Sequence, residues 1–227
     1  MKRSLCLLLA LVLIGTLCAC GRQAAPASAA EASPQAAAAP SAEAAPPAEE
    51  AAPDDGTVEE KAPGLRHAEI TIRGYGTVRL ELDTAAAPIT VENFCALAQA
   101  GFYDGLTFHR IMDGFMIQGG DPNGNGSGGS EEKIRGEFAS NGVDNPISHV
   151  KGVISMARTK DPNSASSQFF ITVADATFLD GNYAAFGRVT EGMELVEQIA
   201  KDARPIDNNG TIPRDQQPVI ESIVITD

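Results

Sequence analysis

Short segments in which polar and apolar residues alternate recur along most of this chain, and they constrain its fold more than any other feature. Glycine, asparagine, aspartate and proline separate them, as is typical of strands joined by turns. Because only two segments have helical spacing, a doubly wound α/β fold is excluded. The pattern predicts a mainly β protein, a closed antiparallel barrel without exposed strand edges. The expected strands are 69–72, 78–82, 107–112, 115–118, 152–156, 168–173, 184–189 and 219–225.

The two helical segments are 88–100 and 193–201. Thr90 is expected to cap the first helix at its N-terminus, and Gly101 is expected to end it. Apolar residues recur on one face of each helix, which predicts that this face packs on the core. These residues are Val91, Phe94, Cys95 and Ala98 in the first helix, and Leu195, Val196 and Ile199 in the second. Cys95 is therefore interpreted as a buried small hydrophobic residue and not as a catalytic thiol.

The first 19 residues have the features of a signal peptide. Lys2 and Arg3 precede an apolar run over 5–17 that is short for a membrane span. The run ends in LCACG at 17–21, which resembles a bacterial lipobox. That resemblance implies cleavage before Cys20, acylation of Cys20 and a lipid-anchored protein on the extracytoplasmic face of the cell membrane. An ordinary secretory signal cut elsewhere and a transmembrane anchor remain alternatives.

Residues 20–64 are predicted to be a disordered tether that follows the lipidated cysteine. Alanine and proline make up 24 of the 44 residues in 21–64, and eight acidic residues outweigh Arg22 and Lys61 there by six charges. Such a segment cannot bury enough apolar surface to offset its chain entropy. Since the whole chain has a net charge of −13 and the leader carries Lys2 and Arg3, about −9 remains on 65–227. An acidic domain argues against nucleic acid as a partner.

Two stretches within 65–227 carry the chemistry: FHRIMDGFMIQGGD at 108–121 and SQFFI at 167–171. They contain an arginine, two glutamines and large apolar side chains, but no nucleophile–base pair. A site of this kind acts by shape and hydrogen bonding. Both stretches resemble the cyclophilin family of peptidyl-prolyl isomerases, and the resemblance covers about 65–227. It implies a closed eight-stranded barrel capped by two helices, and an enzyme that isomerises X-Pro bonds. Because the leader predicts export, the expected clients are exported proteins, and the protein is expected to be a monomer.

The resemblance also assigns roles to residues of this sequence. Arg110 matches the catalytic arginine, which donates to the prolyl nitrogen when the amide is twisted. Phe115, Met116, Phe170 and Leu179 match the proline pocket, and Gln118 and Gln168 match the groove glutamines. Gly126, Ala157 and Arg158 match positions along the peptide groove. Phe178 and Tyr183 stand where many eukaryotic members have tryptophan and histidine, and Arg158 stands where many have asparagine. These departures are expected to change the affinity for inhibitors of the family more than the turnover of substrate.

No cofactor or metal is expected, because His67, His109 and His149 lack ligand spacing. The pattern GNGSGG at 124–129 fits a dinucleotide fingerprint only formally, since no strand precedes it and no helix follows. A second hypothesis is a non-catalytic module that binds proline-containing peptides as a chaperone or scaffold lipoprotein. A solute-binding lipoprotein is a third, for which the chain is short. An intact Arg110 favours the isomerase.

Overall fold

The structure is a computed structural model, and it describes residues 64–227. The predicted signal peptide, the lipidation site Cys20 and the predicted tether up to residue 63 lie outside the described residues. Within 64–227, no helix is both long enough and apolar enough to cross a bilayer.

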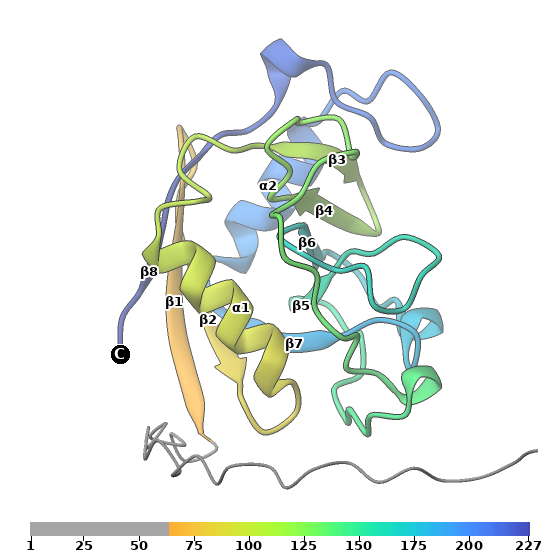
Figure 1. The fold of residues 1–227 in the computed structure, drawn as a ribbon. Coiled ribbons are helices and arrows are strands. Elements are labelled where there is room, and N and C mark those ends of the chain that lie inside the picture. The colour runs from red at the N-terminus through yellow and green to blue at the C-terminus, as the bar shows by residue number, and fades with distance from the viewer. Residues whose placement is uncertain (1–63) are drawn as a thin grey trace, which may run out of the picture. The chain divides into compact units, whose positions relative to one another are not determined.

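Eight antiparallel strands form one strongly curled sheet, as Figure 1 shows. Its order is β3-β4-β6-β5-β7-β2-β1-β8, so most neighbours in the sheet are distant in sequence. All eight predicted strands are present, shifted by a few residues at their ends. Their bounds are β1 Leu65–Ile72, β2 Gly76–Asp83, β3 Phe108–Met112, β4 Met116–Gly119, β5 Val153–Met156, β6 Phe169–Thr172, β7 Ala185–Glu191 and β8 Ile220–Ile225.

The prediction of a closed barrel is not confirmed, because the sheet is an open, curled half-barrel with β3 and β8 at its edges. Within the described residues, one isolated bridge between Thr107 and Val219 joins the starts of these two strands. Phe108 donates its N–H to the carbonyl of Pro218 over 2.9 Å. Local contacts of this kind cover strand edges without a continuous ladder.

Both predicted helices are present: α1 spans Pro88–Gln99 and α2 spans Met193–Asp202. Short 3-10 turns, η1 Ala139–Asn141, η2 Thr177–Leu179 and η3 Arg214–Gln216, lie in the loops. Gly101 ends α1 as predicted: its φ of +70° and the bond from Phe102 N to Leu97 O over 3.0 Å form a glycine-dependent stop.

The predicted capping role of Thr90 is wrong. Ala87 occupies the N-cap position, and Thr90 lies buried inside the first turn of α1. The Glu137 carboxylate, from a distant loop, accepts the backbone N–H of Ile89 over 3.1 Å and that of Thr90 over 2.8 Å. It also accepts the Thr90 hydroxyl over 2.6 Å. A carboxylate at a helix N-terminus satisfies free N–H groups and interacts favourably with the helix dipole.

The main core contains side chains from the sheet and from both helices. Phe94 of α1 is fully buried at its centre, with the rings of Tyr103, Phe169 and Phe186 at 5.3 to 5.6 Å between centroids. Cys95 belongs to the same cluster, as predicted for a small hydrophobic residue. A second, smaller cluster lies apart from this core and consists of Met116, Phe170, Ala176 and Leu179.

Candidate active site

A cleft of about 590 Å³ opens over the smaller cluster and contains most of the residues singled out from the sequence. Gln168 lines an adjoining hollow of about 130 Å³ that shares several walls with it. The structure thus brings together two sequence stretches about 50 residues apart. The predicted residues that line the main cleft are Arg110, Phe115, Met116, Gln118, Gly126, Ala157, Arg158, Phe170, Phe178, Leu179 and Tyr183.

A β-bulge in β3 aims Arg110 into the cleft. Phe108 and Ile111 are three residues apart, so strict alternation would place them on opposite faces, yet both are buried in the core. The β3–β4 register shifts between Phe108 and Arg110, which leaves His109 as the extra residue. Bulges change side-chain parity in this way and are common beside active sites.

Arg110 is held by three protein acceptors. Its Nη1 donates to Oε1 of Gln118 over 3.1 Å, and its Nε donates to the carbonyl of Asn209 over 2.7 Å. Nη2 lies 3.3 Å from the sulfur of Met112. Burial lowers the pKa of Arg110, and Tyr183 and Asp207 oppose this effect. Since a guanidinium begins from so high a pKa, the side chain remains a cation.

The two glutamines continue the polar chain from Arg110. Gln118 Nε2 donates to Gln168 Oε1 over 2.9 Å, and Gln168 Nε2 donates to the carbonyl of Gly128 over 2.7 Å. Each of these hydrogen bonds is donated in the direction away from Arg110, so each side-chain amide has a defined orientation. Linked bonds of this kind polarise one another.

An Asp121-centred turn supports the Gly126 wall. The buried Asp121 carboxylate accepts the backbone N–H groups of Asn123 over 2.8 Å and Asn125 over 3.0 Å, and also that of Gly126. Burial raises the pKa of Asp121, but these donors and nearby His109 lower it below its ordinary value overall. The turn therefore holds an ionised carboxylate beneath the cleft.

Aromatic side chains form the apolar half of the cleft. The ring of Phe115 lies 5.6 Å from that of Phe178, and the ring of Phe170 meets that of Tyr183 edge-on at 6.0 Å. The guanidinium of Arg158 lies 4.6 Å from the Tyr183 ring centroid, and its Nε donates to the carbonyl of Asn182 over 2.9 Å. Arg158 thus contributes its side chain to fixing this wall.

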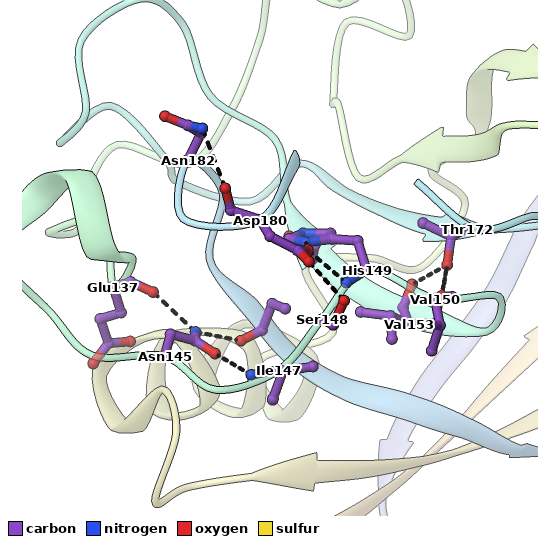
Figure 2. A network of polar contacts seen from close by, with 12 residues as sticks. Glu137, Asn145, Ile147, Ser148, His149, Val150, Val153, Thr172, Asp180 and Asn182 are labelled. Atoms are coloured by element: carbon purple, nitrogen blue, oxygen red, sulfur yellow. Dashed lines mark hydrogen bonds and ion pairs between the residues drawn. The ribbon is translucent and has the colours of Figure 1, made fainter. Parts of the chain in front are cut away.

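The buried His149 and the partly exposed Asp180 belong to a polar network that is drawn in Figure 2. His149 Nδ1 lies 2.8 Å from Asp180 Oδ1, and its Nε2 lies 3.0 Å from Ser155 Oγ. Its ring stacks on Phe170 at 6.1 Å. These three residues have the connectivity of a Ser-His-Asp triad, but Ser155 is fully buried and cannot reach a substrate.

Four residues of the cleft were not predicted: His109, Asn125, Asn209 and Thr211. His109 lines the cleft beside the bulge. It is 4% exposed, and both of its ring nitrogens lack a partner within the described residues. Asn209 and Thr211 come from a loop about 100 residues later. Within 64–227, no group of three or more His, Cys, Asp or Glu side chains is placed to hold a metal.

The chain belongs to the family described as cyclophilin type peptidyl-prolyl cis-trans isomerase/CLD, whose family model matches residues 67–227. It is 46% identical over 135 residues to peptidyl-prolyl cis-trans isomerase-like 1 of Rhizopus delemar, covering 59% of this chain and 80% of that protein. It is 43% identical over 131 residues to peptidyl-prolyl cis-trans isomerase A of Dickeya dadantii, covering 56% and 67%.

Solved structures agree with this assignment. A cyclophilin type peptidyl-prolyl cis-trans isomerase of Cryptosporidium parvum superposes with a TM-score of 0.64 at 30% identity, covering 72% of this chain and 99% of that one. A second structure of that protein, determined in the presence of the dipeptide Ala-Pro, gives a TM-score of 0.62. The family of this chain is therefore that of enzymes that interconvert cis and trans peptidyl-prolyl bonds.

Proposed function

We propose that the cleft isomerises X-Pro bonds without covalent chemistry and that Arg110 is its catalytic residue. The observation that carries the proposal is the position of Arg110, a half-buried cation between an apolar pocket and a chain of oriented amides. Its guanidinium has five N–H groups, of which three have protein acceptors, so two remain for a substrate.

The chemical requirement is to favour a twisted amide over a planar one. Resonance gives the peptide bond a rotational barrier of about 18–20 kcal/mol, and uncatalysed X-Pro exchange takes about tens to hundreds of seconds. When the bond twists, the nitrogen lone pair is localised and can accept a hydrogen bond. A donor fixed near that nitrogen interacts more strongly with the twisted state than with the planar state, which lowers the barrier.

The rest of the cleft would hold the substrate while the bond rotates. Phe115, Met116, Phe170 and Leu179 form a pocket of suitable apolar character for a proline ring. Gln118, Gln168 and the backbone at Gly126 offer hydrogen bonds to an extended peptide on either side. Gly126 has no side chain and Ala157 has a small one, so a peptide backbone can approach both positions closely.

The proposed setting is the outer face of the cell membrane. We propose that residues 1–19 are a lipoprotein signal peptide, that Cys20 is lipidated and that 20–64 tether the domain, which acts as a monomer on exported chains. The lipobox-like LCACG at 17–21 and the Ala/Pro-rich acidic composition support this. Replacing Cys20 by alanine should release the protein from the membrane fraction without changing its specific activity, whereas retention in the membrane pellet would contradict the proposed anchor.

The catalytic proposal is tested by measuring exchange of a proline peptide with the full chain and its Arg110→Ala and Arg110→Lys variants. Arg110→Ala should lower kcat/KM by about 100- to 1,000-fold, the scale of losing one preorganised donor. Arg110→Lys should also be poor, because an ammonium does not reproduce the planar fork. An Arg110→Ala variant as active as the wild type would refute the mechanism. Peptide binding without turnover by the wild type would favour a non-catalytic binding module.

A further inference from the structure

A loop from the C-terminal part of the chain pairs with β3 on both sides of Arg110. Ile111 N donates to the carbonyl of Gly210 over 2.8 Å, and Ile212 N donates to the carbonyl of His109 over 3.0 Å. Thr211 lies opposite Arg110 as an antiparallel bridge partner. Figure 1 shows this loop, between α2 and η3, beside β3. The backbone at Arg110 is therefore fixed from a segment about 100 residues away.

The same loop holds the Arg110 side chain. The bond from Nε to the carbonyl of Asn209, at 2.7 Å, is shorter than the bond from Nη1 to Gln118, at 3.1 Å. A fixed acceptor at Nε restricts rotation of the guanidinium plane, and that rotation decides where Nη1 and Nη2 point. Asn209 therefore influences the aim of the donors toward the cleft.

Gly210 permits this close approach. Its φ is +85°, a conformation that L residues with side chains rarely adopt. A Cβ at this position would lie 2.5 Å from Met112 Cγ and 2.6 Å from the carbonyl oxygen of Ile111. The loop can lie against β3 at this distance only because residue 210 has no side chain.

Asp207 closes the turn that contains Asn209. Its Oδ1 accepts the backbone N–H of Asn209 and that of Thr211, each over 3.0 Å. Its own carbonyl accepts the N–H of Gly210 over 3.2 Å. Hydrogen bonds, first that from the Thr211 backbone, lower the pKa of Asp207, so it is ionised at neutral pH. Within 64–227 this exposed carboxylate forms no ion pair, and its partners are the residues that meet Arg110.

We propose that Asp207 is a positioning residue for catalysis: by fixing the 207–211 turn, it holds the Asn209 carbonyl against Arg110 Nε and aims the guanidinium at the substrate. This inference rests on the proposed catalytic role of Arg110. Asp207 itself touches neither the pocket nor the reacting bond.

The test compares the full chain with Asp207→Ala, Asp207→Asn and a matched control, Asp215→Ala, which removes the same charge from a nearby exposed turn. Asp207→Ala should lower kcat/KM about tenfold, mainly through kcat, because a displaced donor is weaker but not lost. Asp207→Asn retains an acceptor oxygen and should recover most of the activity. Asp215→Ala should behave like the wild type. In Asp207→Ala, the Arg110 Nε–H should also exchange faster with water in ¹⁵N NMR spectra.

A double variant separates positioning from a general structural effect. In an Arg110→Ala background, adding Asp207→Ala should cause no further loss of activity, since the group that is positioned is gone. A further tenfold loss there would overturn the proposal, as would an Asp207→Ala single variant with wild-type activity and unchanged Nε–H exchange. If Arg110→Ala alone is as active as the wild type, the catalytic mechanism fails and this role fails with it. A loss in Arg110→Ala but not in Asp207→Ala overturns only the role of Asp207.

Discussion

Phe169 and Phe170 are neighbours on β6, and they belong to two differently built regions of the molecule. Phe169 is fully buried and meets the rings of Phe94 and Tyr103 edge-on at 5.6 Å, as part of the main core. Phe170 faces the cleft, where it contacts Tyr183 and the ring of His149. The core face consists of large apolar side chains that support one another. The cleft face combines a few such side chains with polar groups that are fixed by partners from distant loops.

The largest expected effect on stability comes from replacing Phe169 or Phe170 by alanine, each in a separate variant. Phe169→Ala should lower the free energy of unfolding by about 3–5 kcal/mol, the range for a buried phenylalanine in a rigid core. Phe170→Ala should lower the free energy of unfolding less, because water can enter the vacated space from the cleft. The same variant should reduce kcat/KM more than Phe169→Ala does. Urea unfolding and peptide exchange of both variants provide the measurement. Equal losses of stability would show that the two faces are not energetically distinct.

Glu137 tests whether the core side can be damaged without affecting the cleft. Glu137→Ala leaves the N–H groups of Ile89 and Thr90 and the Thr90 hydroxyl without their acceptor. Unsatisfied buried donors cost about 1–3 kcal/mol, so we expect a loss of that size in urea unfolding. The kcat/KM for a proline peptide should not change at temperatures where the variant is folded. A parallel loss of activity would mean that α1 and the cleft are coupled.

His109 lines the cleft, and we expect it to make stability sensitive to pH. Burial lowers its pKa below the ordinary value of 6.5; Asp121 opposes this, and Arg110 reinforces it. The unfolded chain therefore binds a proton at His109 more readily than the folded chain does. The stability that the folded chain has with neutral His109 is fully present above pH 6.5. It is lost as the pH falls from 6.5 toward the folded-state pKa. Urea midpoints should fall over that range, and less so in His109→Gln.

Peptide exchange should be nearly constant between about pH 6 and 8, since the Arg110 cation does not titrate there. A bell-shaped activity profile within that range would indicate general acid–base catalysis.

Phe178 should give the smallest effect on stability. Its side chain is 71% exposed and contacts the Phe115 ring at the rim of the cleft. Phe178→Ala should change the free energy of unfolding by less than about 0.5 kcal/mol, as is usual for surface positions. A modest rise in KM is expected, because one apolar wall is shortened. Thermal unfolding together with steady-state kinetics checks this, and a large drop in Tm would show that the rim supports the fold.

The core could be predicted from the sequence more completely than the cleft, and the reason is physical. Alternation in β1 and β2 is a local pattern, and Ile70 and Leu80 are buried as that pattern requires. The bulge at His109 leaves no comparable local signal, so the strand was expected to alternate through it. The acceptor for Arg110 Nε is the backbone carbonyl of Asn209. Every residue type has such a carbonyl, so the sequence does not indicate this contact. The resemblance to the cyclophilin family predicted the roles of Arg110, Gln118 and the pocket residues, which periodicity alone could not predict.

The open sheet has a consequence for solubility. β3 is an edge strand, and the N–H of Ile111 and the carbonyl of His109 would be free to pair with another chain if Gly210 and Ile212 did not occupy them. An edge with unsatisfied backbone groups and apolar neighbours favours intermolecular β-pairing. Substituting Gly210 with a bulky residue should therefore promote concentration-dependent association, visible by light scattering, as the loop is displaced from β3. Solubility would then depend on the same few backbone bonds that lie beside the arginine.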